Sequence, residues 1–478
     1  MSKKEKLVKA ITSRDEDFSK WYTDIVTQAE LSSYSAVRGC MIVRPYATAM
    51  WELIRDDLDR RFKETGHENV IMPMFIPESL LQKEKDHVDG FAPEVAWVTH
   101  GGEEKLSERL CVRPTSEVLF CDHYSDVIES WRDLPKLYNQ WVSVVRWEKS
   151  TRPFLRTREF FWQEGHTAHA TADEAIKETK DILDLYADFF EETLAIPVIK
   201  GVKTESEKFA GAETTYTVES MMYDGKALQS GTSHYFGDGF AKVFDIQYTD
   251  PDNQLQYVHQ SSWGVSSRSI GGIIMVHGDD DGLVLPPAVA PIQIAIIPVA
   301  QHKEGVLEKA TEIYELLKQN YRVKLDDSDR MPGWKFSEYE MKGVPLRLEI
   351  GPRDIESNSC VLVTRDNREK ISVPLNELED RIPALLTEYR QRLFDKAKAH
   401  RESHSYSAKS SEEFFDLLDN RVGFVKGFWC GKADCEAEVK ERTGATSRCI
   451  TDDKTGADDT CYIRGEPASC NVIWGKAY

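Results

Sequence analysis

The stretch RWEKSTRPFLRTREFFWQEGHTAH, residues 146–169, carries the clearest structural signal in the sequence. Two apolar-rich runs, at 137–147 and 159–168, flank a short polar connection, and this pattern predicts a pair of strands joined by a tight loop. The connection concentrates four arginines: Arg146, Arg152, Arg156 and Arg158. Because planar guanidinium groups bind carboxylate and phosphate oxygens in pairs, the loop is a candidate anion site.

Acidic and aromatic residues are interleaved with these arginines. The acidic ones are Glu148, Glu159 and Glu164, and the aromatic ones are Trp147, Phe154, Phe160, Phe161 and Trp162. A charged hairpin exposed to water is the alternative, since surface charge pairs are common and weak. The aromatic residues favour a partly buried polar site, because buried charge persists mainly where pairing or function requires it. Both charge signs indicate a ligand that also carries both.

Length and composition indicate a globular protein of several domains. At 478 residues the chain exceeds one ordinary core, so about two to four domains are expected. No apolar run approaches a membrane span and no secretory signal is visible, so we expect a cytoplasmic protein without membrane association. The net charge of −20 argues against a general nucleic-acid coat, although a local basic track would still suit a nucleic-acid enzyme.

Residues 1–285 do not alternate strands with helices, and they predict an α+β domain with an antiparallel sheet and flanking helices. Apolar residues at helical spacing predict a helix over 46–65, and a capping box begins another over 173–194. Residues 69–75 have the pattern of a buried strand, but Pro73 favours a sheet edge or an interface.

The pattern changes after a proline-rich segment, 284–291, that indicates a linker. Strands then alternate with helices, which predicts an α/β domain with a mostly parallel sheet over residues 286–400. The expected elements are strands at 292–298, 321–325, 346–350 and 361–364 and helices at 304–320, 334–342 and 377–400. A short helix at 411–419 opens a third, small α/β region over 401–478.

The common nucleotide-binding motifs, the P-loop and G-x-G-x-x-G, are absent from the sequence. Any bound ATP would therefore be held by arginines on a sheet. Further polar clusters occur at Arg113-Pro-Thr-Ser-Glu117, Gln229–His234 and Ser262–Arg268. Alone, the first cluster would be interpreted as a proline turn with a solvated glutamate. The other two would be interpreted as a Ser/Gly loop with a core histidine. Together with the arginine loop they offer what amino-acid activation needs: a carboxylate for an ammonium group and arginines for a carboxylate and a triphosphate.

Along nearly its whole length the sequence resembles the prolyl-tRNA synthetases of class II, in the form found in archaea and the eukaryotic cytosol. The segments similar to class II motifs 1, 2 and 3 are 66–73, 146–164 and 262–287. The segments that point more specifically to this family are Arg113–Glu117, Phe154–Phe160 and Trp162–His166. The interval 170–261 is too short for the large editing insertion of bacterial-type relatives.

The resemblance implies the substrate-binding residues. Proline binding is implied for Thr115, Glu117, Arg146 and His234. ATP binding is implied for Arg146, Glu148, Arg156, Thr157, Gln229, Thr232, Ser266 and Arg268. Arg146 would bridge the proline carboxylate and the α-phosphate, and Arg268 would hold the terminal phosphate, so these two are the expected catalytic residues. Mg²⁺ is expected to accompany ATP, and no protein nucleophile is needed.

By the same resemblance the α/β domain binds the anticodon of tRNA(Pro). The polar candidates there are Lys335, Glu340, Arg347, Arg353 and Lys370. Arginine suits guanine O6 and N7 and a carboxylate suits an N–H edge, so Glu340 and Arg347 are the expected readers. A solvated face is an equally good interpretation of any one of them.

Three of nine cysteines match the zinc-site spacing of the family's C-terminal domain: Cys430, Cys435 and Cys461. Where relatives have a further cysteine, this chain continues from Cys461 with Tyr-Ile-Arg464. Structural zinc takes four nitrogen or sulfur ligands. Either Cys449 or Cys470 supplies the fourth, or the metal is lost, and we favour loss because a displaced ligand must still meet tetrahedral geometry.

The expected function is that of a homodimeric proline–tRNA ligase, which activates L-proline with ATP to prolyl-adenylate and transfers it to the 3′ end of tRNA(Pro). A synthetase-like protein that only binds tRNA or a partner is one alternative, disfavoured by the complete set of implied substrate residues. A class II ligase for threonine or serine is another, and the segments at Arg113 and Trp162 fit proline better. In the family a C-terminal tyrosine, here Tyr478, reaches toward the active site.

Overall fold

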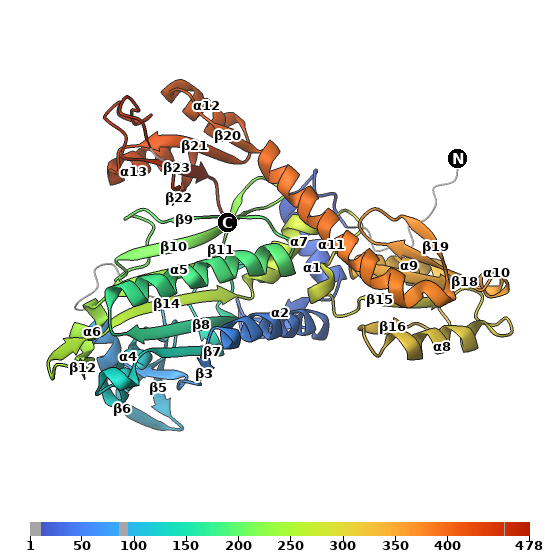
Figure 1. Ribbon diagram of the computed structural model, residues 1–478, viewed down its shortest axis with the longest axis horizontal. Helices are drawn as coiled ribbons and strands as arrows, with labels where there is room; N and C mark the ends of the chain where they lie inside the picture. Colours follow the sequence, from blue (N-terminus) through green and yellow to red (C-terminus); the bar gives the residue numbers. More distant parts are fainter. Residues whose placement is uncertain (1–10, 86–93, 454) are drawn as a thin grey trace.

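The computed structural model describes residues 11–85, 94–453 and 455–478, and its largest element is an eleven-stranded sheet (Figure 1). The strands, in chain order, are β3 (Glu68–Asn69), β7 (Lys136–Val145), β8 (Glu159–His169), β9 (Val198–Val202), β10 (Thr214–Met221), β11 (Ala227–Gly237), β14 (His259–Ser266), β20 (Ser405–Ser407), β21 (Phe424–Trp429), β22 (Thr446–Ile450) and β23 (Cys470–Gly475). Their order across the sheet is β20-β21-β23-β22-β9-β10-β11-β14-β8-β7-β3. Only the two end pairs are parallel, so the predicted antiparallel sheet is confirmed.

The predicted hairpin around the arginine loop is present as β7 and β8, which pair from Lys136 with Ala168 to Val145 with Glu159. Side chains alternate across β8, so Gln163 points to the opposite face from its neighbours and accepts a hydrogen bond from Tyr186 Oη at 2.7 Å. Gly165 lies on that same face, where a Cβ would come within 2.2 Å of the Trp263 ring. One face of the sheet is therefore tightly packed.

Helices cover this packed face (Figure 1). They are α1 (Phe18–Gln28), α2 (Pro45–Glu64), α5 (Ala172–Asp188) with its continuation η2 (Phe189–Thr193), and α7 (Arg268–His277). The predicted helices at 46–65 and 173–194 are thus confirmed, and α5 begins with the expected capping box, in which Thr171 accepts from the Glu174 amide at 3.3 Å. The core between helices and sheet contains Phe62, Tyr186 and Trp263.

The first region also contains smaller elements. They are β1 (Ser32–Tyr34), β2 (Met41–Val43), β4 (Phe75–Pro77), α3 (Glu78–Lys85), β5 (Ala96–Gly101), β6 (Glu104–Val112), α4 (Glu117–Val127), η1 (Trp131–Asp133), α6 (Gly239–Phe244), β12 (Gln247–Thr249) and β13 (Leu255–Tyr257). The single buried strand predicted at 69–75 is wrong. β3 and β4 belong to different sheets, and Ile71 between them is 87% exposed. Pro73 has no amide proton, and Arg113 binds the carbonyls of Met72 and Pro73 at 2.8 and 3.3 Å, so no strand ladder forms there.

The α/β domain contains a five-stranded sheet in the order β16-β15-β17-β18-β19. Its elements are η3 (Pro287–Val289), β15 (Ile294–Pro298), α8 (Val306–Leu317), β16 (Val323–Leu325), α9 (Pro332–Met341), β17 (Leu346–Ile350), α10 (Pro352–Glu356), β18 (Ser359–Thr364), β19 (Lys370–Pro374), η4 (Leu375–Glu377) and α11 (Leu378–Ser403). The sheet is mixed: β15 pairs with β16 and β17 in parallel, whereas β17, β18 and β19 are antiparallel. The predicted mostly parallel sheet is therefore only half right, because β17, β18 and β19 pair in antiparallel fashion. The connection between β18 and β19 is too short for a parallel crossover and permits only a hairpin.

The segment predicted as a linker is packed. Val284, Leu285 and Val289 are each no more than 4% exposed, and the Leu285 amide donates to the Gly343 carbonyl at 3.2 Å. Proline content marked the change of domain but not the burial of the segment.

The C-terminal region adds its strands to the sheet of the first region, with α12 (Ser411–Asn420) and α13 (Ala433–Thr443) beside them (Figure 1). The seam is the pair Ile450–Val202, between β22 and β9. A Cβ on Gly201 would lie 2.5 Å from the Ile450 carbonyl oxygen and 2.6 Å from Cys449 Cβ, so this close approach requires glycine. The domain boundaries at 285 and 400 stay a prediction, since one sheet extends across them.

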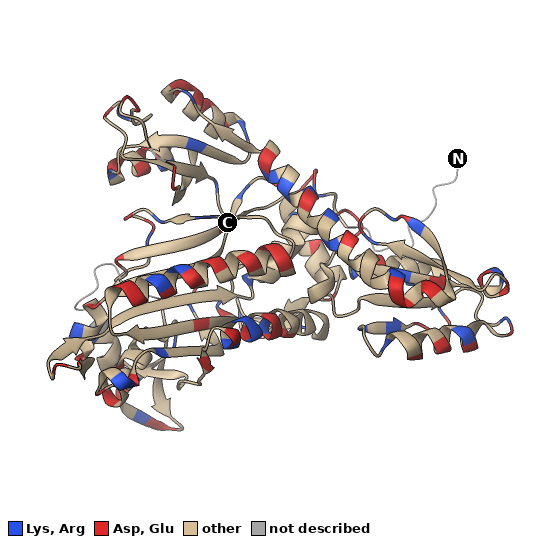
Figure 2. Ribbon diagram, in the orientation of Figure 1, with Lys and Arg blue, Asp and Glu red and all other residues tan. Residues whose placement is uncertain are grey.

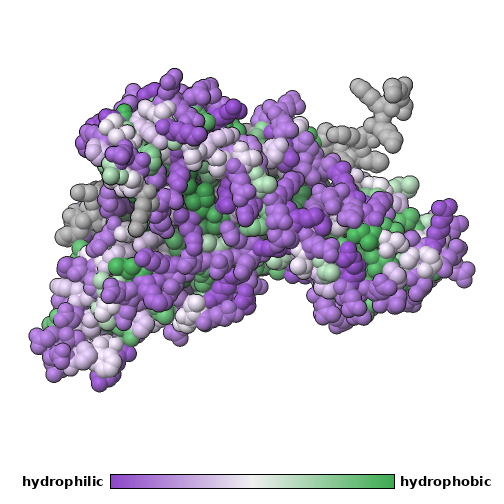
Figure 3. Space-filling model, turned by 45° about the horizontal axis from the view of Figure 1, so that its top comes forward, coloured by the Kyte–Doolittle hydropathy of each residue, from purple (hydrophilic) through white to green (hydrophobic). Residues whose placement is uncertain are grey.

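Charged side chains lie mainly on the outer helices, and the strands are largely uncharged (Figure 2). Hydrophilic residues dominate the face shown in Figure 3. Within the described ranges, no helix combines the length and apolar character needed to cross a bilayer.

His277, at the end of α7, makes stability depend on pH. Its buried Nε2 donates to the Leu194 carbonyl at 2.9 Å, and burial lowers its pKa from 6.5 to about 4. As the pH falls, His277 is therefore protonated in the unfolded chain before it is protonated in the folded protein. The stabilisation that is present above the pKa of the unfolded state is lost as the pH falls toward the pKa of the folded state. Between about pH 7 and pH 5 the loss from this group is about 2 kcal/mol.

We expect His277→Gln, which keeps a donor to Leu194 but cannot titrate, to show a smaller fall in melting temperature than the unmodified protein over that range. Differential scanning calorimetry at both pH values measures it. Equal falls for both proteins would contradict the assignment.

Candidate active site

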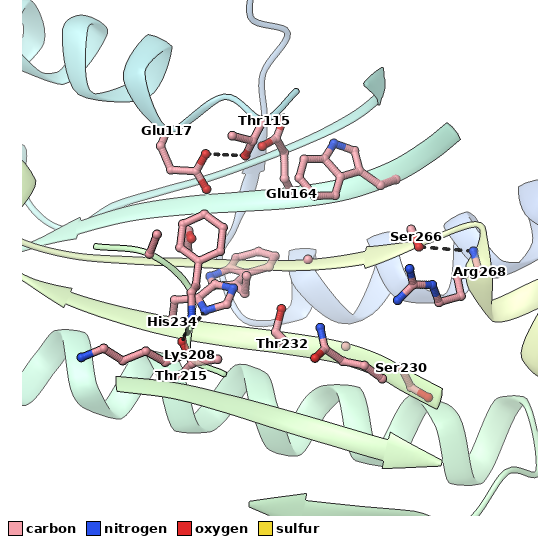
Figure 4. Close-up of a pocket in the computed structure, with 18 of the residues that line it drawn as sticks. Thr115, Glu117, Glu164, Lys208, Thr215, Ser230, Thr232, His234, Ser266 and Arg268 are labelled. Carbon is pink, nitrogen blue, oxygen red and sulfur yellow. Dashed lines mark hydrogen bonds between the residues drawn. The ribbon is translucent and has the colours of Figure 1, made fainter. Parts of the chain in front are cut away.

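A cavity of about 430 Å³ lies on the face of the sheet opposite α5, over β8, β14, β11 and β10 (Figure 4). Its lining includes eight of the residues that the sequence implicated: Thr115, Glu117, Arg146, Gln229, Thr232, His234, Ser266 and Arg268. They come from segments far apart in the chain, and antiparallel pairing places them on one face. All four implied proline-binding residues and five of the eight implied ATP-binding residues therefore share one cavity.

One end of the cavity is acidic. Glu117, at the start of α4, accepts a hydrogen bond from the Thr115 hydroxyl (Figure 4). Glu164 and His166 on β8 lie beside it, with ligating atoms of all three residues within 4.8 Å of one another. Burial raises the pKa of Glu117, and the neighbouring Glu164 charge adds to the rise. A cation placed here would offset the cost of the buried carboxylate.

Glu164 is held as an anion by its surroundings. It accepts from Ser116 Oγ at 2.5 Å and Gln140 Nε2 at 2.7 Å, and it pairs with His166 Nε2 at 2.9 Å. Burial alone would raise its pKa, but the His166 interaction and these hydrogen bonds lower it. Glu164 is thus fully engaged within the protein, and Glu117 is the carboxylate left to meet a ligand.

Arg146 lies between the two ends of the cavity. Its Nε donates to the Pro114 carbonyl at 3.1 Å, and its guanidinium packs over the rings of Phe160 and Trp162 at 5.5 and 5.3 Å. Burial lowers its pKa, and Glu117, Glu164 and Glu148 partly counteract this. These contacts fix the plane of the guanidinium and leave its terminal nitrogens for a ligand.

Arg268, at the start of α7, forms the cationic end (Figure 4). Its Nε donates to the Leu155 carbonyl at 3.1 Å and its amide to Ser266 Oγ at 3.3 Å. Burial lowers its pKa to about 10, with repulsion from Arg146 and Arg156 as further causes. Among the described residues, neither Arg146 nor Arg268 has a carboxylate within ion-pair distance. Two half-buried cations that form no ion pair with a described carboxylate make a site for a polyanion.

β10 and β11 form the floor of the cavity. His234 pairs with Thr215, whose hydroxyl lies 3.0 Å from His234 Nδ1, and burial lowers the pKa of His234 to about 3, so this imidazole is neutral. Thr232 faces Thr217 in the same register. A bulge at Ser230 then shifts the strand, so that Gln229 pairs with Glu219. Bulges of this kind re-aim side chains beside active sites.

Three implied ATP residues lie outside the cavity lining, in the loop after β7. Arg156 Nη1 and Glu148 Oε2 form an ion pair at 3.8 Å. The buried Thr157 hydroxyl donates to the Glu159 carbonyl at 2.6 Å. The loop brings Arg156 close enough to affect Arg268, but the structure gives Thr157 a role within the hairpin itself.

The sequence analysis did not assign several lining residues. On β8, the alternate positions Phe160, Trp162, Glu164 and His166 all line the cavity, and the two-residue period of the strand would have identified them. Lys208 and Phe209 also line it, from the connection between β9 and β10. No pattern in that connection marks them, because their placement depends on tertiary packing.

The two expected anticodon readers contact each other. Arg347 Nη1 lies 2.9 Å from Glu340 Oε1, Arg347 Nε lies 2.9 Å from Glu349 Oε1, and its guanidinium packs on the Phe336 ring at 4.1 Å. Lys335 is buried and donates to the carbonyls of Asp326 and Ser328 at 2.7 and 2.8 Å, which removes it from the candidate readers. A base that binds Arg347 must share or displace its carboxylate partners.

The cysteine cluster is present but incomplete. The sulfurs of Cys430, Cys435 and Cys461 lie within 4.8 Å of one another. Cys449 is buried at the β22–β9 seam, and Cys470 does not join the group, so the described residues offer three thiols where structural zinc takes four ligands. Arg464 pairs instead with Asp434 at 3.3 Å. The set does not fit a structural zinc ion.

Tyr478, which by the resemblance reaches toward the active site, lies beside the arginine loop and is not part of the cavity lining, so this role stays a prediction. Its hydroxyl donates to Asp224 Oδ2 at 2.6 Å, and the Arg152 guanidinium lies 5.4 Å from its ring centre.

The chain is similar to known proteins along most of its length. Family models match residues 97–277 as a "tRNA synthetase class II core domain (G, H, P, S and T)", 293–385 as an "Anticodon binding domain" and 411–478 as "Prolyl-tRNA synthetase, C-terminal". The chain is 67% identical to a proline–tRNA ligase of Ruminiclostridium cellulolyticum over the whole of both chains. It is 62% identical to proline–tRNA ligase 2 of Bacillus cereus, covering 98% of this chain and 99% of the relative.

Among solved structures, the prolyl-tRNA synthetase of Cryptosporidium parvum, complexed with halofuginone and AMPPNP, is similar with a TM-score of 0.94. It shares 41% identity and covers 98% of this chain and 99% of its own.

The incomplete cysteine set predicts that the purified protein holds less than one zinc per chain, and that a chelator does not change its melting temperature. Arg464→Cys, which returns a fourth thiol beside Cys461, should raise zinc binding toward one ion per chain. Elemental analysis of both proteins measures this. Stoichiometric zinc in the unmodified protein would show that another group completes the site.

Proposed function

Because this chain belongs to the proline–tRNA ligase family of class II aminoacyl-tRNA synthetases, we propose that its cavity activates proline with ATP through the residues described above. The observation that carries this assignment is the position of Arg146 between a carboxylate end and a cationic end of one cavity. The imino cation of proline complements the carboxylate end, and the phosphates of ATP complement the cationic end. A cavity of one sign would not orient the two substrates against each other.

At the acidic end, Glu117 and Thr115 hold the imino group of proline. The raised pKa of Glu117 supports this, because burial disfavours its charged form and a cationic ligand beside it would stabilise that form. His234 is neutral and buried beside Phe209, so it contributes a wall and a hydrogen bond without repelling the imino cation.

At the other end, Arg268 holds the terminal phosphate, and Gln229, Thr232 and Ser266 contact the nucleotide. Attack of the proline carboxylate on the α-phosphate brings two anions together. Arg146 binds both and offsets their repulsion, and its aromatic and carbonyl contacts hold it in place before the reaction. Mg²⁺ that enters with ATP would neutralise phosphate charge and favour departure of pyrophosphate.

The adenylate is then the acceptor for the terminal ribose hydroxyl of tRNA(Pro), whose anticodon is placed by the α/β domain, with Glu340 and Arg347 as the proposed readers. We also infer a cytoplasmic homodimer. Ile71, Met74 and Phe75 are exposed by 87%, 47% and 44% around Pro73, and such an apolar surface favours association with a second copy.

Proline-dependent ATP–pyrophosphate exchange, run with each amino acid, tests the function and separates proline from threonine and serine. In this assay Arg146→Ala should lower the rate by about a hundredfold or more, because loss of one preorganised donor to a developing charge costs about 3–4 kcal/mol. Arg146→Lys keeps the charge without the planar fork and should recover only part of the rate. Near-normal exchange by the alanine variant would contradict the role.

Glu117→Gln should raise the KM for proline by about tenfold or more, since a hydrogen bond between charged groups contributes about 1.5–3 kcal/mol. The KM for ATP should change little. Glu104→Gln, at an exposed carboxylate on β6, serves as the matched control. An unchanged proline KM in Glu117→Gln would place the imino group elsewhere.

A further inference from the structure

A buried ionic cluster joins the C-terminal region to the sheet that floors the cavity. Lys203 Nζ lies 2.7 Å from Glu219 Oε1, and Arg448 Nη2 lies 3.1 Å from Glu219 Oε2. The side chains of Lys203, Glu219 and Arg448 are 1%, 1% and 7% exposed. Glu219 belongs to β10, whereas Arg448 comes from β22, beyond the seam with β9 (Figure 1). Two cations on one buried anion make a cluster that is sensitive to loss of any member.

Glu219 shares a face with the proposed nucleotide residues. Opposed residues of an antiparallel pair lie on the same face, and β10 pairs with β11 as Thr215–His234, Thr217–Thr232 and Glu219–Gln229. The first pair lines the cavity directly. The Thr217 hydroxyl donates to Glu219 Oε1 at 2.9 Å, and Thr217 lies opposite Thr232, so the cluster extends to the strand pair that presents Thr232.

The cluster is also next to the bulge that presents Gln229. Ser230 is the extra residue of β11 at this point, and its hydroxyl lies 2.6 Å from that of Ser220 on β10. An irregular strand position has fewer ladder hydrogen bonds to hold it. Its geometry therefore depends on the rigidity of β10, which Glu219 ties to Lys203 and Arg448.

Resting on the proposed function of the cavity, we propose that Arg448 is a positioning residue for ATP: through Glu219 it holds the β10–β11 bulge that presents Gln229 and Thr232. The C-terminal region thus contributes to nucleotide binding without touching the nucleotide. A purely structural role would lower stability and affect proline and ATP alike. A positioning role acts on the nucleotide end, because the proline-binding residues Thr115 and Glu117 lie on the other side of the cavity (Figure 4). His234, which also belongs to the proposed proline site, is on β11 but in the regular part of the ladder, where Thr215 holds it away from the bulge.

Steady-state pyrophosphate exchange, with ATP varied at saturating proline and proline varied at saturating ATP, separates the two roles. Arg448→Met keeps the length of the side chain and removes its charge. We expect it to raise the KM for ATP about tenfold and to change the KM for proline by less than about twofold. Arg448→Lys, which keeps the charge but not the planar fork, should show a smaller rise in the ATP KM than Arg448→Met.

The control is Arg365→Met. Arg365 is 2% exposed in its side chain and pairs with Asp279 at 2.6 Å, so it is also a buried arginine between regions, but it follows β18 and lies outside the sheet that contains the bulge. It should leave the ratio of the two KM values unchanged. If Arg448→Met does not fold, Arg448→Lys is compared with Arg365→Lys by the same ratio, since loss of the planar fork should still raise the ATP KM selectively.

Equal changes in both KM values, or none in the ATP KM, overturn the proposal. Gln229→Ala distinguishes this result from failure of the proposed function. If Gln229→Ala raises the ATP KM and Arg448→Met does not, the nucleotide site stands and the positioning role is wrong. If Gln229→Ala leaves the ATP KM unchanged, the nucleotide assignment itself fails.

Discussion

Two half-buried guanidinium groups in one cavity, neither in an ion pair with a described carboxylate, are the constraint on which the site depends. Repulsion from Arg146 helps to lower the pKa of Arg268. A backbone carbonyl holds each guanidinium group, and two aromatic rings pack against that of Arg146. Such an arrangement is destabilising until an anion arrives. Because these two arginines form no ion pair with a described carboxylate, their interaction with phosphates contributes to substrate binding and to bringing two anions together.

The sheet makes this arrangement possible because its two faces are used differently. One face receives α2, α5 and α7 and provides the apolar core, with Gly165 admitting the ring of Trp263. The other face carries alternate polar residues from β8, β10, β11 and β14 into the cavity. A net charge of −20 is compatible with a cationic cavity, because the acidic residues lie largely on exterior helices (Figure 2). The electrostatic character of the site is therefore local.

Much of this arrangement could be predicted from the sequence, where local signals were strong. The hairpin at 137–168 and the helix after Thr171 followed from periodicity and capping, and the arginine loop was the clearest functional signal. Failures occurred where tertiary contacts decide. Arg113 takes the carbonyls that a strand at 69–75 would have used, and Lys335 is drawn inward by the carbonyls of Asp326 and Ser328. The ion pair between Glu219 and Arg448 joins two regions, and no pattern in the sequence around either residue predicts it.

The seam between β22 and β9 has a consequence for biosynthesis. While the chain is emerging from the ribosome, β9 is an unpaired edge of the first sheet until β22, which follows it in the chain, has been made. Open edges of this kind recruit strands from other molecules. Lys200 within β9 and Lys203 just after it supply charges that discourage such pairing in nascent chains. In the folded protein Lys200 pairs with Asp184 on α5 and Lys203 with Glu219 on β10, so the charges that protect the open edge are also used within the first region.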